Sequence, residues 1–272
     1  MKKLIIAVTA LGLLAFGSLS VQASPQSDLK AFQGYFKKNF PKIKFDDFSN
    51  GLYALPEAAD RRAEWEAIEE FPPYELDLAK GKKFWEKNKL GTCFKNGGAG
   101  IAQNYPYWDK KKKEVRTAEL DINACLKRQG KKPIKKGKLA TVTAYFYNMA
   151  RGKRIKIDVS APGAIAEYEK GKHFFWAKRG QLNFSCANCH ISGAGKRVGG
   201  NIMSTALGHG TGFPAYRSKW GGLGTIHRRY KGCNKQVRTA PLKQNNKTYR
   251  ALQLYETYMN TGLPLTAPSN RF

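Results

Sequence analysis

The sequence predicts a mainly α-helical protein made of two similar halves in tandem, with long loops in the second half. A basic and aromatic motif occurs twice, as Lys-Gly-Lys-Lys-Phe-Trp at residues 80–85 and as Lys-Gly-Lys-His-Phe-Phe at residues 170–175, and each copy runs on to a cysteine. Helix-forming runs span residues 60–70, 139–151 and 249–260. A spacing of 90 residues between the motifs suits two small domains of one type.

The first 23 residues have the pattern of a secretory signal peptide. Lys2 and Lys3 precede a mostly apolar run over residues 4–19, and Val21-Gln22-Ala23 is a small-residue cleavage pattern. Glycine and serine interrupt the run, which is shorter than the ~20 apolar residues that a membrane-spanning helix needs. No later stretch is apolar enough to span a membrane, so we expect the mature protein to be periplasmic.

The chain is strongly basic, with a formal net charge of +28. A charge of this sign favours anionic partners, and nucleic acid is one of them. Secretion argues against nucleic acid, and the lysines and arginines are spread along the chain rather than gathered in one arm. An acidic protein partner or an anionic substrate is the better expectation. Single runs such as Lys110 to Lys113 are read as solvated surface.

The mature chain begins with an arm over residues 24–71 that carries no catalytic pattern. We expect a helix from Asp60, as its cap, to the Pro72-Pro73 pair that ends it. The arm either embraces the molecule or belongs to the first domain. A basic turn at 131–137 and Pro162-Gly163 frame the junction, so we expect domains at 24–155 and 156–272.

The most specific chemical signal is Cys186-Ala187-Asn188-Cys189-His190. Two cysteines three positions apart with a histidine directly behind them are typical of covalent c-type haem attachment, with both thiols bound to the porphyrin and the imidazole on the iron. Zinc would need a second ligand pair of similar spacing, and none follows. A redox Cys-x-x-Cys pair would not need the histidine. The sequence therefore predicts one covalently bound haem c, with His190 as an iron ligand.

The first half has a degenerate counterpart of this motif. Cys93 follows the first repeat as Cys186 follows the second, but neither a second cysteine nor a histidine comes after it. The first half is therefore predicted to be a cytochrome c-like domain without haem. Cys93 and Cys125 lie 32 positions apart, and in an oxidising compartment we expect them to form a disulfide worth ~3 to 4 kcal/mol.

Of the five cysteines this leaves Cys233, which lies in a run rich in arginine and lysine. Nearby cations stabilise thiolate, which is both a metal ligand and a nucleophile, and they would also attract a sulfur oxyanion. Cys233 is our preferred second iron ligand. Met203, His209 and His227 remain alternatives.

With the haem motif in the second of two cytochrome-like halves and the stretch from Arg228 to Arg238 behind it, the sequence resembles the SoxA family, the catalytic subunits of the SoxAX cytochrome complex of thiosulfate oxidation. The resemblance covers nearly all of the mature chain. It is to the single-haem members of the family, because the first motif is broken at Cys93.

The resemblance implies roles for particular residues. Cys186 and Cys189 would anchor the haem, and His190 and Cys233 would be the axial ligands of its iron. Cys233, often a persulfide in the family, and Arg229 would be catalytic, with Arg229 binding the substrate.

The resemblance also implies a reaction. Thiosulfate would be joined oxidatively to the carrier cysteine of SoxYZ, and electrons would pass through haem to the SoxX subunit and on to a downstream cytochrome. The competing hypothesis is a c-type cytochrome that only transfers electrons in the periplasm, with Cys233 setting the potential of its iron. A haem-based sensor or carrier without turnover is a third, weaker possibility.

Overall fold

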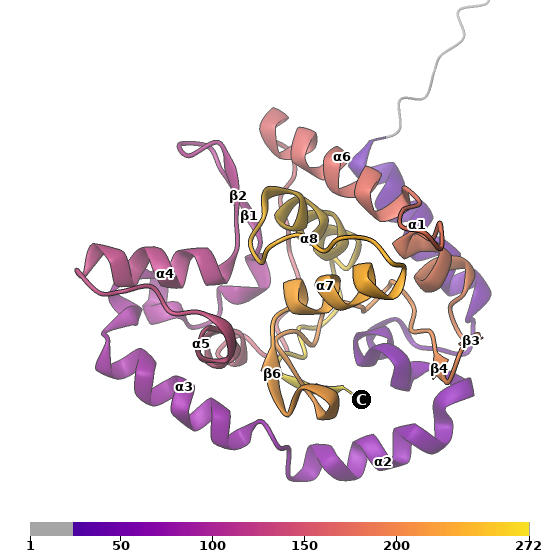
Figure 1. The fold of residues 1–272 in the computed structure, drawn as a ribbon, viewed down its shortest axis with the longest axis horizontal. Helices are drawn as coiled ribbons and strands as arrows, with labels where there is room; N and C mark the ends of the chain where they lie inside the picture. The colour runs from indigo at the N-terminus through magenta and orange to yellow at the C-terminus, as the bar shows by residue number, and fades with distance from the viewer. Residues whose placement is uncertain (1–23, 272) are drawn as a thin grey trace, which may run out of the picture.

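The computed structural model describes residues 24–271 (Figure 1), so the leader predicted for residues 1–23 lies outside the described residues. Eight α-helices are found in this range: α1 Pro25–Asn39, α2 Ala59–Glu70, α3 Glu75–Lys87, α4 Ala118–Arg128, α5 Lys136–Asn148, α6 Pro162–Trp176, α7 Ile226–Gln236 and α8 Lys247–Met259. The strands are short: β1 Tyr107–Asp109, β2 Glu114–Arg116, β3 Arg197–Val198, β4 Asn201–Ile202, β5 Ala215–Arg217, β6 Gly222–Gly224 and β7 Ser269–Arg271. The mainly helical class predicted from the sequence is confirmed.

Two helix crossings of the same kind are found, one in each half of the chain. In the first, Gly81 of α3 lies against α5, where a Cβ on the glycine would stand 2.7 Å from the carbonyl oxygen of Thr141. In the second, Gly171 of α6 lies against α8, where a Cβ would stand 2.1 Å from the carbonyl oxygen of Ala251. Both glycines come from the repeated sequence motif. The repeat therefore marks equivalent places where two helices touch through their backbones.

Aromatic side chains fill the interior of the first half beside its crossing. Trp85 packs on Phe94 and Phe146, with ring centroids 5.2 and 5.6 Å apart, and Phe94 lies 5.1 Å from Phe146. The disulfide predicted between Cys93 and Cys125 is present and joins the start of this cluster to α4. Stacked aromatic rings and a cross-link thus hold the half of the chain that lacks the haem motif.

The N-terminal arm packs on the second half of the chain, and Figure 1 shows α1 alongside α6. Asp28 accepts hydrogen bonds from Tyr168 and Lys172 of α6, at 2.8 and 2.5 Å. Gln33 donates to the carbonyl oxygen of Thr261, beyond the end of α8. Helix α1 of the arm therefore contacts α6 and the segment after α8.

The helix expected from Asp60 is present as α2, with one difference at its start. It begins at Ala59. Its N-cap residue is Ala58, whose methyl side chain cannot accept a hydrogen bond. The expectation that Asp60 caps the helix is wrong, because the turn at Pro56–Ala58 leads directly into the helix and the cap lies two residues earlier, at Ala58. The helix ends at Glu70, before the two prolines, as expected.

The two halves share one continuous hydrophobic core and are also joined by polar contacts. In the segment between α5 and α6, the backbone N–H of Ile155 donates to Leu263, and Gly152 donates to Leu265. Glu114 of β2 accepts hydrogen bonds from Arg116 and, across the halves, from Arg250 of α8 at 2.8 Å. Within residues 24–271, no helix is both long and apolar enough to cross a membrane.

The glycine-rich segment that follows the haem motif forms loops and short strands, as predicted. In its three-stranded sheet, β5 lies between β6, to which it is antiparallel, and β7, to which it is parallel. Strand β6 ends at Gly224 and leads through Thr225 directly into α7. The sheet therefore fixes where α7, the helix that carries Cys233, begins.

Candidate haem site

The predicted attachment motif lies at the surface of the second half, after the loop that follows α6. Ser185 and Asn188 close the turn that holds it: the Ser185 backbone N–H donates to Oδ1 of Asn188 at 2.9 Å, and the Asn188 N–H donates to Oγ of Ser185 at 3.1 Å. The chain then makes a short π-helical turn over Asn188–Ser192. Turns of this kind are frequent at functional sites, and this one directs His190 inward.

His190 is buried, with 6% of its surface exposed. Its Nδ1 lies 2.9 Å from the carbonyl oxygen of Ser204. A carbonyl only accepts hydrogen bonds, so Nδ1 carries the proton and Nε2 keeps its lone pair. Burial lowers the pKa of His190 well below its usual value, and the charges of His209 and Arg229 lower it further. The imidazole is therefore neutral and in the tautomer that binds a metal through Nε2.

Cys186 and Cys189 are free thiols and half-buried. Burial raises the pKa of Cys186 to about 12, with a further rise from the charge of Glu256, so the thiol stays protonated. The Arg179 guanidinium lies 3.7 Å from its sulfur. Burial also raises the pKa of Cys189, and a negative charge on Cys233 adds to that rise. Both thiols are thus unbonded and three positions apart, as attachment to a porphyrin requires.

Cys233 lies on α7, one helical turn after Arg229. The helix is capped by Thr225, whose hydroxyl accepts a hydrogen bond from the backbone N–H of Arg228. Residues four apart share a helix face, so Arg229 and Cys233 project in the same direction, and both are half-buried. Tyr230, one position further round, points into the core. Arg228 is exposed to solvent.

The structure brings the predicted site residues together from two segments more than 30 residues apart. A charge on Cys233 acts on the pKa values of both Cys186 and Cys189. The charge of Arg229 acts on Cys189 and on His190. Arg229 and Cys233 on α7 are therefore within electrostatic range of the attachment motif.

The alternative iron ligands are placed less suitably. Met203 follows β4, and its backbone hydrogen bonds fix it to Gly195 and Lys196 in the hairpin. His227 is buried in the core, where its Nδ1 accepts a hydrogen bond from the backbone N–H of Asn245. His209 stacks directly on the ring of His190, with centroids 4.3 Å apart. Its ring therefore lies directly against the ring of His190.

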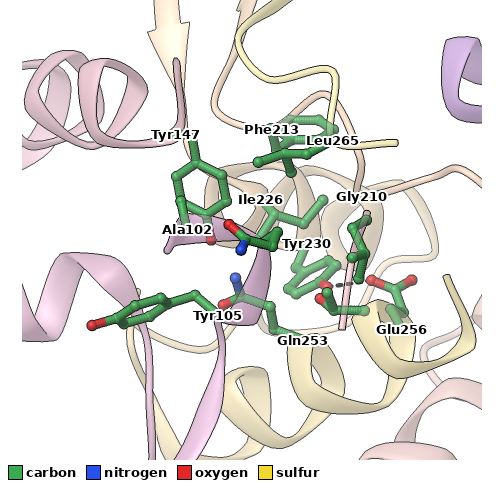
Figure 2. A pocket seen from close by; sticks show the side chains of 13 residues that line it. Ala102, Tyr105, Tyr147, Gly210, Phe213, Ile226, Tyr230, Gln253, Glu256 and Leu265 are labelled. Atoms are coloured by element: carbon green, nitrogen blue, oxygen red, sulfur yellow. Dashed lines mark hydrogen bonds between the residues drawn. The ribbon is translucent and has the colours of Figure 1, made fainter. Parts of the chain in front are cut away.

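Behind the site, a buried carboxylate joins α8 to the loop and to α7. Glu256 accepts a hydrogen bond from Tyr230, and its other oxygen lies 3.3 Å from Nδ1 of His209. Figure 2 shows this carboxylate and Tyr230 at the wall of an internal cavity, with Gln253 beside them and Phe213 and other apolar side chains around it. The cavity lies on the core side of α7. It is not lined by the attachment motif.

The residues present fit a haem of the c type. Two free thiols, a neutral imidazole with a bare Nε2 and a third thiol are the donors that covalent attachment and two axial bonds need. Shortly before the motif, Leu182 and Phe184 each leave 44% of their surfaces exposed, and exposed apolar surface of this kind is typical of a site that a ligand or partner covers. Among the described residues, no group of three or more His, Cys, Asp or Glu side chains is arranged to hold a bare metal ion.

Several contributors to the site could not be found from the sequence. Ser204 acts through its backbone carbonyl, so its side chain carries no signal. Glu256 and Arg179 each lie on a different element from the residue they contact. Arg217, at the end of β5, is in electrostatic range of both Arg229 and Cys233 but precedes them by more than ten residues in the sequence.

The fold and the site define a c-type cytochrome that has a further free thiol, Cys233, on α7. The sequence model of the SoxA/TsdA cytochrome c domain family matches residues 80–155. The chain is 47% identical to the L-cysteine S-thiosulfotransferase subunit SoxA of Chlorobaculum thiosulfatiphilum, over 94% of this chain and 91% of that protein. It is 43% identical to the SoxA subunit of Allochromatium vinosum, over 92% and 91%. The chain belongs to the SoxA family.

A solved structure has the same fold. The crystal structure of SoxXA from P. pantotrophus aligns with a TM-score of 0.71, covering 77% of this chain and 84% of that one, at 24% sequence identity. The likeness extends beyond the residues that the family model matches, because the aligned share is much larger than residues 80–155. The mainly helical architecture is therefore shared over most of the chain.

Proposed function

We propose that the protein is the SoxA-type subunit of an L-cysteine S-thiosulfotransferase, which couples thiosulfate to a cysteine of a SoxYZ-type carrier protein. Its relatives of 43–47% identity carry this name over nearly their whole length. The observation that carries the proposal is the placement of Arg229 and Cys233 one turn apart on α7, with both in electrostatic range of Cys189. An arginine and a thiol next to a redox cofactor are what the coupling of a sulfur oxyanion needs.

One haem c is held by the second half in this proposal. Cys186 and Cys189 would attach it covalently, and Nε2 of His190 and the sulfur of Cys233 would bind its iron. When bound, the haem would act as a one-electron acceptor, and the oxidation of sulfur needs such an acceptor. The carbonyl of Ser204 holds the His190 ring in the metal-binding tautomer.

The reaction joins two sulfur atoms. The carrier thiol and thiosulfate become a cysteine S-thiosulfonate: a sulfur–sulfur bond forms, the S–H bond of the thiol breaks, and one proton and two electrons are released. Arg229 binds and orients the sulfonate oxygens of thiosulfate, because a guanidinium forms two parallel hydrogen bonds with such a group. The net charge of +28 speeds the approach of anions.

We propose SoxX as the partner subunit, with which the protein forms a heterodimer, and a downstream cytochrome as the acceptor of electrons. The structural neighbour is a SoxXA complex, which supports this assignment. Two electrons leave in each turnover and one haem takes one at a time, so a second haem in a partner is useful. The predicted leader over residues 1–23 supports a periplasmic location.

We further propose that the chain consists of two cytochrome c-like domains, at 24–155 and 156–272, and that the first has lost its haem. The equivalent crossings at Gly81 and Gly171 support the duplication. The aromatic cluster around Trp85 and the disulfide at Cys93 support the loss of haem, because they occupy and close the interior of the first domain.

The proposal is tested with the haem-loaded protein, its SoxX partner, thiosulfate and a SoxYZ carrier. Mass spectrometry of the carrier should find the S-thiosulfonate of its cysteine. Cys233→Ala and Arg229→Ala should each slow its formation by at least tenfold. Lys235→Ala, an exposed position on the same helix, is the matched control and should leave the rate unchanged. If both site variants kept full coupling activity, Cys233 and Arg229 would have no catalytic role; if the wild type formed no S-thiosulfonate, the protein would be an electron carrier without sulfur chemistry.

A further inference from the structure

The loop at residues 204–209 holds His190 by three contacts. The carbonyl oxygen of Ser204 accepts a hydrogen bond from Nδ1 at 2.9 Å, and the backbone N–H of Ala206 donates to the carbonyl oxygen of His190 at 2.8 Å. The ring of His209 stacks on the ring of His190, with centroids 4.3 Å apart and planes inclined by 27°. The contacts fix the backbone, one ring nitrogen and one ring face, so this loop determines how the imidazole is oriented.

Two buried side chains at the end of α8 hold the loop in turn. Asn260, the residue that follows the helix, accepts a hydrogen bond from the backbone N–H of Gly208 at 2.7 Å. Oε1 of Glu256 lies 3.3 Å from Nδ1 of His209, which carries the proton because a carboxylate only accepts. Asn260 also donates to the backbone carbonyl of Glu256. Glu256 and Asn260 are 5% and 1% exposed, so water does not compete for these bonds.

The other carboxylate oxygen of Glu256 binds α7. The hydroxyl of Tyr230 donates to it, as the dashed line in Figure 2 shows. Tyr230 is buried, and Cys233 comes three positions later on the same helix. Residues three apart are neighbours on a helix surface. A shift of α7 that moved Cys233 would therefore also break the hydrogen bond between Tyr230 and Glu256.

The partners of Glu256 argue against a role in stability alone. Within residues 24–271, no lysine or arginine forms an ion pair with it, whereas Glu114 pairs with two arginines. A buried polar group that serves only stability is often replaced by an apolar one without loss. Glu256 instead contacts one side chain on each of the two segments that meet at the haem site, His209 in the loop and Tyr230 on α7.

We propose that Glu256 is a positioning residue for the haem site, which fixes His190 and Cys233 relative to each other. It acts on the imidazole through His209 and on the helix of the thiol through Tyr230. The inference rests on the proposed function for the identity of the two iron ligands. Two ligands held by one buried group keep a single geometry, whereas ligands on independent elements vary separately.

The first test is the electron paramagnetic resonance spectrum of the oxidised, haem-loaded complex with its partner subunit. Tyr230→Phe removes one oxygen atom and frees α7. His209→Phe keeps a ring against His190 and loses only the bond to Glu256. Glu256→Gln puts an amide N–H against the protonated Nδ1 of His209. Each variant should show a second low-spin signal beside that of the wild type, because the ligands no longer hold one geometry.

The matched control is Gln253→Met. Gln253 lies on the same helix, is 7% exposed and lines the same cavity, but it forms no hydrogen bond with His209 or Tyr230. This variant should lose stability and keep the wild-type spectrum. A positioning role is thus separated from a general disturbance of α8.

The second test is the reduction potential, measured by redox titration followed by haem absorbance. Glu256→Gln removes a negative charge behind the site and should raise the potential. Tyr230→Phe keeps that charge and should change the potential less, and Gln253→Met should keep the wild-type value. In the coupling assay, Glu256→Gln and Tyr230→Phe should each slow formation of the S-thiosulfonate about tenfold.

The outcomes separate this inference from the proposed function. A thiolate-type wild-type spectrum and normal coupling, with unchanged spectra and potentials in Glu256→Gln and Tyr230→Phe, overturn the inference and keep the function. Changed spectra and potentials in these variants, with a wild type that forms no S-thiosulfonate, support the inference and overturn the function.

Two further results would overturn the inference whether or not coupling occurs. One is a wild-type spectrum without a thiolate ligand, and the other is a change in Gln253→Met as large as that in Glu256→Gln. Thermal midpoints show whether each variant is folded. Tyr230→Phe, the smallest change, decides the question if Glu256→Gln does not fold.

Discussion

Gly171 in α6 lies so close to α8 that a Cβ on it would stand 2.1 Å from the carbonyl oxygen of Ala251. The backbone cannot move away without separating the two main helices of the second half. We expect Gly171→Ala to lower the free energy of unfolding by about 3 kcal/mol, at the upper end of overpacking effects. Denaturant unfolding followed by circular dichroism measures the change.

Glycine-to-alanine changes at two other positions provide comparisons for that prediction. Gly81→Ala, at the equivalent crossing of α3 and α5, should cost less, because its nearest contact would be 2.7 Å. Gly34→Ala, within α1 and with no atom within 4 Å of the new Cβ, should stabilise the protein by about 0.5–1 kcal/mol. Equal effects at all three positions would show that the crossings are not closely packed.

The disulfide should matter for the first half in particular. The double variant Cys93→Ala, Cys125→Ala opens a loop of 32 residues and should lower the free energy of unfolding by about 3–4 kcal/mol. Haem absorbance in the second half should remain at low denaturant concentration. A loss of haem absorbance in step with the fluorescence of Trp85 would instead show that the two halves unfold as one unit.

The sequence predicted what depends on neighbouring residues and missed what depends on distant ones. The haem motif and the disulfide pair follow local covalent rules, and both could be named in advance. Glu256 could not, because it lies on α8, 47 positions beyond the loop residue His209 that it contacts. The carbonyl of Ser204 carries no side-chain signal at all. The direction in which α1 packs depends on Asp28 meeting Lys172, a pairing of two distant residues.

The same distinction applies to errors within single elements. Asp60 was a reasonable cap by residue type, yet the helix starts at Ala59 because the chain is already turning at Pro56. Cys233 was identifiable because a thiol in a cationic run is unusual. Its electrostatic effect on Cys189 depends on where the fold places α7, which the sequence does not reveal.

A polar cluster between the halves gives a further prediction. Glu114 accepts hydrogen bonds from Arg116 and Arg250, both of which are less than 10% exposed. Burial acts to raise the pKa of Glu114, but the hydrogen bonds and charges of the two arginines outweigh it and the pKa is lowered. Glu114→Gln leaves two buried guanidinium groups less well paired and should lower the free energy of unfolding by about 2 kcal/mol at pH 7.

The lowered pKa of Glu114 determines how this loss of stability changes with pH. Because the pKa of Glu114 is lower in the folded state, its contribution is full above its unfolded value of 4.5 and is lost as the pH falls below it. The difference in stability between the wild type and Glu114→Gln should therefore shrink between pH 5 and about pH 3. Glu64→Gln, on the exposed face of α2, is the control and should show no such trend. A difference that is constant over this range would contradict the ion pairing.

His227 should make the folded protein sensitive to acid at higher pH. Burial lowers its pKa from 6.5 to about 3, and the neutral ring accepts a hydrogen bond from the backbone N–H of Asn245. The unfolded chain binds a proton at His227 below pH 6.5 and the folded protein does not, so the contribution to stability is full above pH 6.5 and falls as the pH drops toward 3. One such group changes the free energy of unfolding by about 1.4 kcal/mol per pH unit.

His227→Asn keeps an acceptor for the backbone N–H of Asn245. This variant should be less stable than the wild type at pH 7, and its free energy of unfolding should lack the part of the pH dependence that His227 causes. His173→Asn, at an exposed position on α6, should keep the wild-type slope. Thermal and urea unfolding between pH 4 and 7 measures both, and equal slopes for the wild type and His227→Asn would show that His227 titrates alike in the folded and unfolded states.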